Sequence, residues 1–251
     1  MAVVRIIMNA FIMAAEIAAI VGLAYLGYHA PFVFAGVTVA VCLLYGLRLE
    51  YARLSYELPF YFEAGRSPRV WFALLVGSGE ALFKSLLAGV AALFTFSGTD
   101  ADRLFLVAIV FGISVYLGSW MLRSLSIGLG ARPSRWGYFR LAAPLGLIFS
   151  AGMTGLAMGG MIPMPSIGEL GLRVVWEFPA QPSIEQVSEL VFQLKQAFDN
   201  FVVRALSVFM PVDVARVLGV LISVNMLTGF VSALYASVIA SGVRSAEQRL
   251  L

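Results

Sequence analysis

Six long runs of apolar residues, separated by shorter polar segments, dominate this chain of 251 residues. The runs cover residues 6–26, 31–47, 70–97, 104–122, 141–162 and 212–241. A helix rises about 1.5 Å per residue and a hydrocarbon core is about 30 Å thick, so each run has roughly the length needed to cross a bilayer. None shows the strict alternation of a membrane β-strand. The pattern therefore predicts an all-α integral membrane protein, a bundle of about six transmembrane helices.

The segment between the fifth and sixth runs, residues 163–211, has a different pattern. Its first half carries Pro163, Pro165, Pro179 and Pro182, which oppose regular helix. Ser183 and Gln186 then have the spacing of a capping box. Apolar residues follow at steps of three and four: Ile184, Val187, Leu190, Val191, Leu194, Phe198, Phe201 and Val202. This periodicity predicts an amphipathic extracytoplasmic helix over residues 184–206.

The apolar face of this predicted helix needs a surface to cover it. Its polar face carries more acidic than basic residues, which argues against an anchor on anionic lipid. We therefore expect the helix to cap the bundle or to contact another subunit. The candidate partner-contact residues are Leu190, Leu194 and Phe198.

The loop after the second run, residues 48–69, mixes charged residues with aromatic and aliphatic ones. The charges at positions 48, 50, 53 and 57 leave Leu47, Tyr51, Leu54 and Leu58 on another helical face. We expect the second helix to continue into the cytoplasm and to break at Pro59, with a turn at residues 65–68. The segment is interpreted as lying on the membrane surface or as docking a cytoplasmic partner.

These patterns divide the chain into three parts. Residues 1–162 form a five-span region that includes the cytoplasmic loop 48–69. Residues 163–211 form the extracytoplasmic loop with its helix. Residues 212–251 form the final transmembrane helix and a cytoplasmic tail.

Composition supports a lipid environment. Hydrophobic residues make up 61% of the chain and charged residues 12%, about half the usual share in soluble domains. The net charge of +3 does not indicate nucleic-acid binding, because the basic residues are spread over the segments that flank the spans. Membrane lipids, other membrane subunits or further copies of this chain are the expected partners.

The distribution of basic residues predicts an orientation. Eleven Lys and Arg residues, including Arg53 and Arg123 in predicted loops, fall on one side of the membrane, and five fall on the other. The richer side is expected to be cytoplasmic, which places both termini in the cytoplasm. This bias suits a bacterial inner membrane.

Charged residues within spans are costly and mark candidate functional sites. Glu80 and Lys84 are four residues apart in the third run, the favourable order for a helical ion pair. Glu16 lies midway along the first run and would complete a Glu–Lys–Glu cluster if the two helices were neighbours. Asn225 in the last run can bond to another helix. These four residues form the candidate intramembrane polar site.

The sequence offers no recognisable catalytic motif. The single cysteine, Cys42, lies inside a run, and His29 is the only histidine, so neither a disulfide within the chain nor a Cys/His metal site is predicted. No phosphate-binding loop is present and no cofactor is expected.

These observations favour a non-catalytic subunit or scaffold of a larger membrane-embedded assembly. The alternative is a small ion or solute transporter or channel that uses Glu16, Glu80 and Lys84. A lipid-modifying enzyme is the weakest of the three interpretations, because no polar cluster that would serve as its site can be assembled from the sequence.

Overall fold

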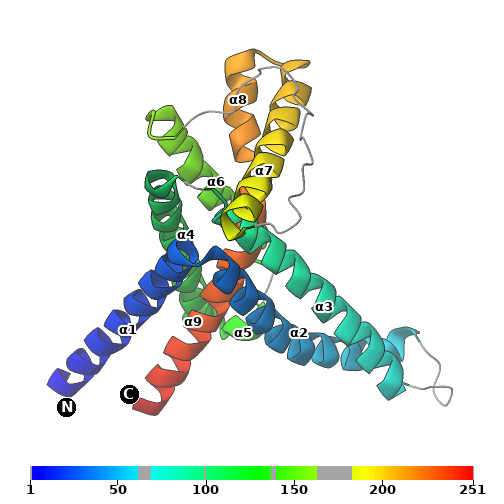
Figure 1. Cartoon of the computed structure of the whole chain (residues 1–251). Coiled ribbons are helices and arrows are strands. Elements are labelled where there is room, and N and C mark those ends of the chain that lie inside the picture. The colour runs from blue at the N-terminus through cyan, green and yellow to red at the C-terminus, as the bar shows by residue number, and fades with distance from the viewer. Residues whose placement is uncertain (1, 62–68, 99, 137–139, 163–182, 251) are drawn as a thin grey trace.

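The computed structural model describes the chain except residues 1, 62–68, 99, 137–139, 163–182 and 251. Every described element is a helix (Figure 1). The elements are α1 (Ala2–His29), α2 (Pro31–Tyr61), α3 (Arg69–Thr95), α4 (Ala101–Leu129), α5 (Pro133–Trp136), α6 (Ala142–Met158), α7 (Ile184–Ser207), α8 (Val212–Leu221), the 3₁₀ helix η1 (Val224–Leu227) and α9 (Thr228–Leu250).

Five helical segments of the described chain are long and apolar enough to cross a membrane. They are Ile6–His29, Pro31–Leu54, Leu74–Thr95, Ala101–Leu129 and Val212–Arg249, with lengths from 22 to 38 residues. The fold is thus all-helical with five candidate membrane-spanning helices. The run predicted at residues 141–162 forms α6, an apolar helix of only 17 residues.

Helix α6 ends earlier than its apolar run because glycines stop it. Gly160 adopts a φ of 72°, a left-handed conformation that glycine tolerates without strain. The N–H of Met161 donates to the carbonyl of Leu156, and that of Gly160 donates to the carbonyl of Ala157. These two bonds form a Schellman motif, which satisfies carbonyls at the end of the helix.

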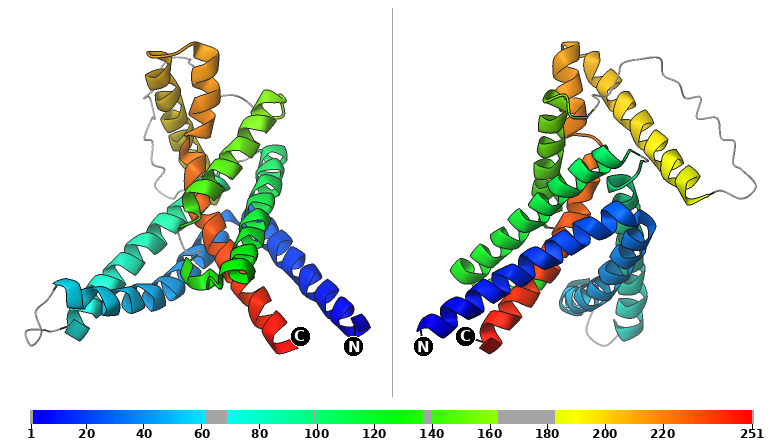
Figure 2. Two further views of the ribbon diagram at one scale, coloured as in Figure 1. Left: turned by 180° about the vertical axis from the view of Figure 1, so that it is seen from behind. Right: turned by 60° about the vertical axis from the view of Figure 1, so that its left-hand side comes forward.

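Helix α9 lies at the centre of the bundle and packs on α1, α3, α4 and α6 (Figure 2). Four buried aromatic rings join it to its neighbours. The Phe34 ring lies 5.1 Å from Phe96, 5.7 Å from Phe111 and 5.5 Å from Tyr235, measured between centroids. Mostly edge-to-face contacts of this kind stabilise the core beyond the area that the rings bury.

Helices α2 and α3 form a hairpin that packs mainly on itself and extends away from α9 (Figures 1 and 2). Glycines allow the two helices to approach closely. A Cβ atom on Gly77 would lie 3.2 Å from Leu54 Cδ1, and one on Gly89 would overlap Val39. The hairpin is therefore held together by direct contact between its two helices.

The expected helix break at Pro59 is wrong, since α2 continues to Tyr61. A proline in the last turn removes one backbone donor near a point where the helix ends in any case, so its effect is small. The predicted turn at residues 65–68 and the first half of the loop at 163–211 lie outside the described residues.

The last apolar run was expected to be one continuous helix, and this is wrong. It forms α8, a break, η1 and then α9. The hydroxyl of Ser223 accepts a hydrogen bond from the Asn225 N–H and so starts a new turn. Helix α8 ends with the Ile222 N–H bonded to the carbonyl of Leu218.

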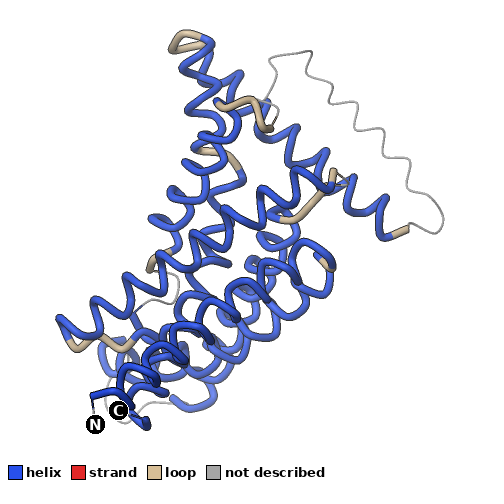
Figure 3. The backbone as a smooth tube through the Cα atoms, turned by 90° about the vertical axis from the view of Figure 1, so that its left-hand side faces the viewer, coloured by secondary structure: helices blue, strands red, loops and turns tan. Residues whose placement is uncertain are grey.

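Helices α7 and α8 form a second hairpin at the end of the molecule opposite the start of α1 and the end of α9 (Figures 1 and 3). The two helices meet where Gly219 of α8 faces Val203 of α7, and a Cβ on Gly219 would overlap Val203. The start of α1 and the end of α9 lie on the same side of the bundle (Figure 1).

Candidate functional site

Five charged residues form the α2–α3 charge cluster: Glu50, Arg53, Glu57, Glu80 and Lys84. Arg53 lies at its centre. Its guanidinium nitrogens are 3.0 Å from Glu50 Oε2, 3.3 Å from Glu57 Oε1 and 2.8 Å from Glu80 Oε2. One guanidinium therefore joins three carboxylates from both helices of the hairpin.

Lys84 provides the second cation of the cluster. Its Nζ donates to Glu50 and lies 3.7 Å from Glu80 Oε2, so the predicted pairing of Glu80 with Lys84 is present. The Glu50 side chain is only 5% exposed, against 38% for Glu80. A buried carboxylate requires compensating charge, and Lys84 and Arg53 provide it from either side.

Helix geometry explains how these side chains meet. Glu50, Arg53 and Glu57 are separated by three and four residues, which places them on one face of α2. Glu80 and Lys84 share a face of α3 in the same way. Gly77, one turn before Glu80, lies against the α2 backbone at Glu50 and lets the two charged faces approach.

A second group, the α1–α4–α9 triad, consists of Glu16, Arg123 and Glu247. Arg123 Nη1 lies 2.9 Å from Glu16 Oε2, and Arg123 Nη2 lies 2.8 Å from Glu247 Oε1. The hydroxyl of Ser119, one turn before Arg123, donates to Glu16 Oε1 at 2.6 Å. The side chain of Glu16 is 3% exposed, so both of its oxygens have partners inside the bundle.

The structure does not bring Glu16 to Glu80 and Lys84, so the expected Glu–Lys–Glu cluster is not formed. Helix α1 packs on α4, α2 and α9, whereas the charged face of α3 is turned towards α2. Glu16 pairs instead with Arg123, and Glu80 pairs with Arg53 and Lys84. Arg53 and Arg123, which the sequence analysis assigned to loops, are the two arginine partners.

Sequence reasoning missed Glu50, Arg53, Arg123 and Glu247 as parts of the site. For the first two a signal was present, since their spacing of three residues on an extended second helix favours an ion pair. No comparable signal joins Arg123 to Glu16, because 107 residues separate them.

Helix α7 is docked on the end of α3 by two polar contacts and on the start of α4 by a cation–π contact. The Ser188 hydroxyl accepts from the Gly98 N–H at 3.2 Å, and Lys195 Nζ donates to the carbonyl of Phe94 at 3.3 Å. The guanidinium of Arg103 lies 4.4 Å from the centre of the Phe192 ring. The predicted capping box of Ser183 and Gln186 at the start of α7 is confirmed.

Lys195 is buried on the face of α7 that packs against the bundle, an unusual place for a lysine. It lies at the C-terminal end of α3, where carbonyl groups lack helical partners and favour a cation. Burial lowers the pKa of Lys195 to about 8; the charge of Asp199 acts in the opposite direction and that of Arg103 adds to the lowering. The docking contact is therefore sensitive to proton concentration.

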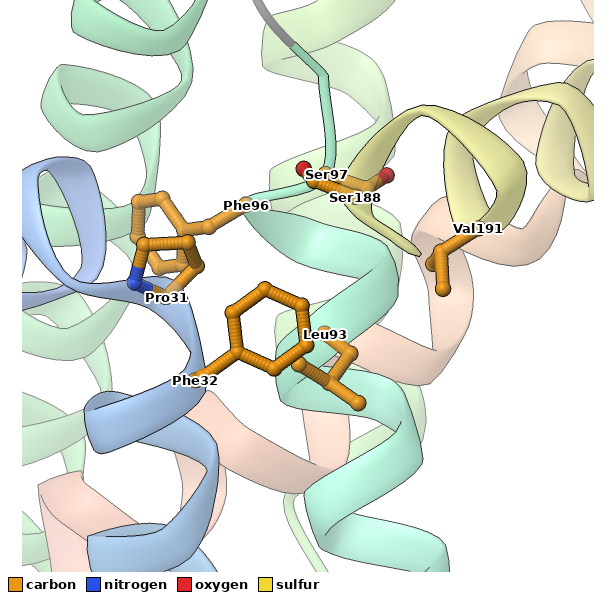
Figure 4. A pocket seen from close by; sticks show the side chains of 7 residues that line it. All are labelled: Pro31, Phe32, Leu93, Phe96, Ser97, Ser188 and Val191. Carbon is orange, nitrogen blue, oxygen red and sulfur yellow. The ribbon is translucent and has the colours of Figure 1, made fainter. Parts of the chain in front are cut away.

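A small pocket lies where the start of α2, the end of α3 and α7 meet. Figure 4 shows its lining, which is Pro31, Phe32, Leu93, Phe96, Ser97, Ser188 and Val191. The wall is mostly apolar and carries no charged group. We assign no chemistry to this pocket.

The outer face of α7 has no partner within the described chain. Leu194 is 46% exposed, Phe198 48% and Phe201 60%, while Leu190 is half-buried. Two of the three predicted partner-contact residues are thus exposed beside a further aromatic residue. They lie on a helix whose opposite face is fixed to the bundle.

Asn225 and Thr228 lie in and after the break between α8 and α9. The Thr228 hydroxyl is 2.8 Å from that of Thr95 on α3 and forms a hydrogen bond between the two helices. Asn225 is 5% exposed, but its Oδ1 has no hydrogen-bond partner in the structure. The expected bond from the side-chain oxygen of Asn225 to another helix is not made.

The site therefore consists of two compensated ion-pair groups and one broken helix, within an all-helical protein that has five candidate membrane-spanning helices. In the described part of the chain, no group of three or more His, Cys, Asp or Glu residues is placed to hold a metal ion. Comparisons with protein-family models, curated proteins and solved structures give no match for this chain.

Proposed function

We propose that the chain is a non-catalytic scaffold subunit of a larger membrane-embedded assembly. The observation that carries this proposal is the outer face of α7. Phe198 and Phe201 are exposed on a helix that Ser188 and Lys195 fix to the bundle from its other side. A rigidly held helix with exposed aromatic residues is a favourable docking element, because little ordering entropy is lost on binding.

The charge clusters support a structural role. Among the described residues, Glu16 and Glu50 are the most buried carboxylates, and each lies within an ion pair that joins two helices. Transport of a charged solute would require a group that exchanges partners, whereas these groups already bond to each other. Their arrangement favours fixed positions of α1, α2, α3 and α4.

The proposal includes the arrangement in the membrane. Helix α6 is a sixth, short span that crosses with the five longer ones, and α7 is an amphipathic extracytoplasmic helix. Both termini face the cytoplasm and the membrane is a bacterial inner membrane, as the excess of arginine on that side favours. Lipids surround the bundle, and the partner on α7 is another membrane subunit or a second copy of this chain.

Site-specific photo-crosslinking in native membranes tests this function. A photoreactive phenylalanine analogue replaces Phe198 or Phe201 on α7. The control places it at Phe83, which is 69% exposed on α3 and not on the α7 face. We expect one discrete protein adduct from the two α7 positions and none from Phe83. Lipid adducts alone at all three positions would remove the scaffold proposal.

The broken last segment favours a second candidate, a small transporter or channel. Many transporters form their sites where a spanning helix is interrupted, with main-chain carbonyls exposed at the break. Flux measurements in liposomes test this alternative: Glu80→Gln and Asn225→Leu would each reduce flux of the transported ion. Liposomes that contain the wild-type chain and remain impermeable to ions would argue against the transporter or channel.

A further inference from the structure

The break between α8 and α9 contains polar atoms that the charge clusters and the α7 face do not explain. Asn225 is 5% exposed and its Oδ1 has no partner. Ser150 on α6 is fully buried, and its Oγ also has no partner. A buried polar atom without a hydrogen bond destabilises a fold by about 1–3 kcal/mol, so two such atoms near one break require an explanation.

The packing of α6 places Ser150 beside the break. A Cβ on Gly146 would overlap the carbonyl of Met226, and one on Gly229 would overlap the carbonyl of Ala142. Residue numbers therefore rise along α6 as they fall along the last segment, and the two elements are antiparallel. Ser150 follows Gly146 by one turn on the same buried face, so it lies level with the residues just before Met226.

The break also exposes main-chain oxygens. The last four carbonyls of any α-helix have no partners within it. In α8 the carbonyl of Leu218 is taken by the Ile222 N–H, and that of Ser223 accepts from Met226 N–H in the next turn. Carbonyls of the last turn of α8 lie between these two bonds, at the negative end of the helix dipole.

The donor set selects a class of ligand. Asn225 Oδ1, Ser150 Oγ and main-chain carbonyls are neutral oxygen atoms, and no carboxylate of the α2–α3 charge cluster or of the α1–α4–α9 triad belongs to this group. Neutral oxygens suit a monovalent cation better than a divalent one, which needs carboxylates. The close contact of α6 with η1 at Gly146 favours a small ion.

We propose that the break between α8 and α9 binds a partly dehydrated Na⁺ ion. Asn225 Oδ1, Ser150 Oγ and carbonyls from the last turn of α8 hold it. The ion occupies the place where a continuous helix would have satisfied its own carbonyls and fixes α6 against the last segment. This inference does not rest on the proposed scaffold function, because a bound cation serves a structural subunit as well as a transporter.

Thermal unfolding of the purified full chain in detergent tests the proposal. NaCl is exchanged for choline chloride at constant ionic strength. Binding to the folded state alone raises the unfolding midpoint with ion concentration, and we expect a rise of roughly 3 °C between 1 and 100 mM NaCl. Binding of ²²Na⁺ to the same sample gives a direct second measurement.

Matched variants locate the site. Ser150→Ala and Asn225→Leu each remove one ligand, so both are expected to lose the Na⁺-dependent rise and at least tenfold in ²²Na⁺ affinity. Ser126→Ala is the control, since Ser126 is 3% exposed on α4 with an unpartnered Oγ but lies away from the break. It is expected to retain both effects.

The outcomes that overturn the proposal are specific. Equal unfolding midpoints of the wild-type chain in NaCl and choline chloride, with no displaceable ²²Na⁺ binding, exclude the site even if a variant fails to fold. A Na⁺-dependent rise that survives in both Ser150→Ala and Asn225→Leu places the ion elsewhere. If the midpoints are equal and no ²²Na⁺ binds, buried water is what forms hydrogen bonds with the Asn225 and Ser150 side chains.

Discussion

The guanidinium of Arg123 lies 2.9 Å from the carboxylate of Glu16, although 107 residues separate the two in the sequence. The same guanidinium donates to Glu247 at 2.8 Å. One side chain on α4 thus connects α1 and α9. Because the Glu16 side chain is almost fully buried, loss of this contact would leave a buried carboxylate without a cation partner.

Removal of Arg123 is expected to destabilise the fold more than removal of the whole pair. Arg123→Leu leaves the buried carboxylate of Glu16 without a cation, which costs about 3–5 kcal/mol. Glu16→Gln combined with Arg123→Leu should regain at least half of that loss, because no buried charge remains. Unfolding midpoints of the single and double variants in detergent measure the difference. A double variant less stable than Arg123→Leu would contradict the assignment.

Reversing one charge of the α2–α3 charge cluster is expected to lower stability more than exchanging the charges of Glu50 and Lys84. Glu50→Lys puts two cations together in a buried position and should lower stability by about 2–3 kcal/mol. Adding Lys84→Glu restores an opposite-charge pair between positions 50 and 84 and should recover part of the stability, because the new lysine still faces Arg53 and the new glutamate faces Glu80. Glu57→Gln serves as the control, because Glu57 is 42% exposed and its pair with Arg53 is worth less than about 1 kcal/mol.

Docking of α7 is expected to strengthen as pH rises from about 8 to 10.5. The pKa of Lys195 is lowered from 10.5 to about 8 by burial. Below pH 8 the lysine is protonated whether α7 is docked or free, so the full desolvation penalty opposes docking. Above pH 10.5 it is neutral in both states and the penalty, about 3 kcal/mol, is gone.

Hydrogen exchange of the α7 amides, corrected for the intrinsic pH dependence of exchange, measures this effect. Protection should rise across the stated pH range in the wild-type chain. Lys195→Met removes the titrating group, so the protection of its α7 amides should stay nearly constant across this pH range. A pH dependence of the same size that persists in Lys195→Met would show that Lys195 is not its source.

Two glycines of the bundle are expected to respond differently to alanine. A Cβ on Gly229 would overlap the backbone of α6 at Ala142 and Gly146, so Gly229→Ala should lower the unfolding midpoint by several degrees. Gly155 on α6 has no atom within 4 Å of such a Cβ. Gly155→Ala should therefore be neutral or slightly stabilising, since alanine favours the helix. Equal effects of the two changes would contradict the packing of α6 on α9.

The positions of the helices were predictable from the sequence, because apolar runs of spanning length leave few alternatives. The residues at which the helices end were harder to predict. Helix α6 stops four residues before its run ends, since Gly160 supplies a left-handed turn that hydropathy does not detect. The capping box at Ser183, by contrast, depends on local spacing alone, and the sequence located it correctly.

The site was harder to predict because the periodicity of each helix does not show which helices lie side by side in the fold. Arg53 and Arg123 were interpreted as orientation signals at the membrane surface, yet both lie within helices and pair with carboxylates on other helices. The break at Ser223 was missed for a related reason. Its residues remain apolar enough for a span, and only Ser223, whose hydroxyl accepts a hydrogen bond from the Asn225 N–H, marks the interruption.

The central position of α9 has a consequence for biosynthesis. Helix α9 is translated after α1, α3, α4 and α6, the helices that it contacts. These helices enter the bilayer before α9 is present, and Arg123 on α4 is made before its partner Glu247 on α9. Until α9 is inserted, the surfaces that it covers are therefore open to membrane quality control.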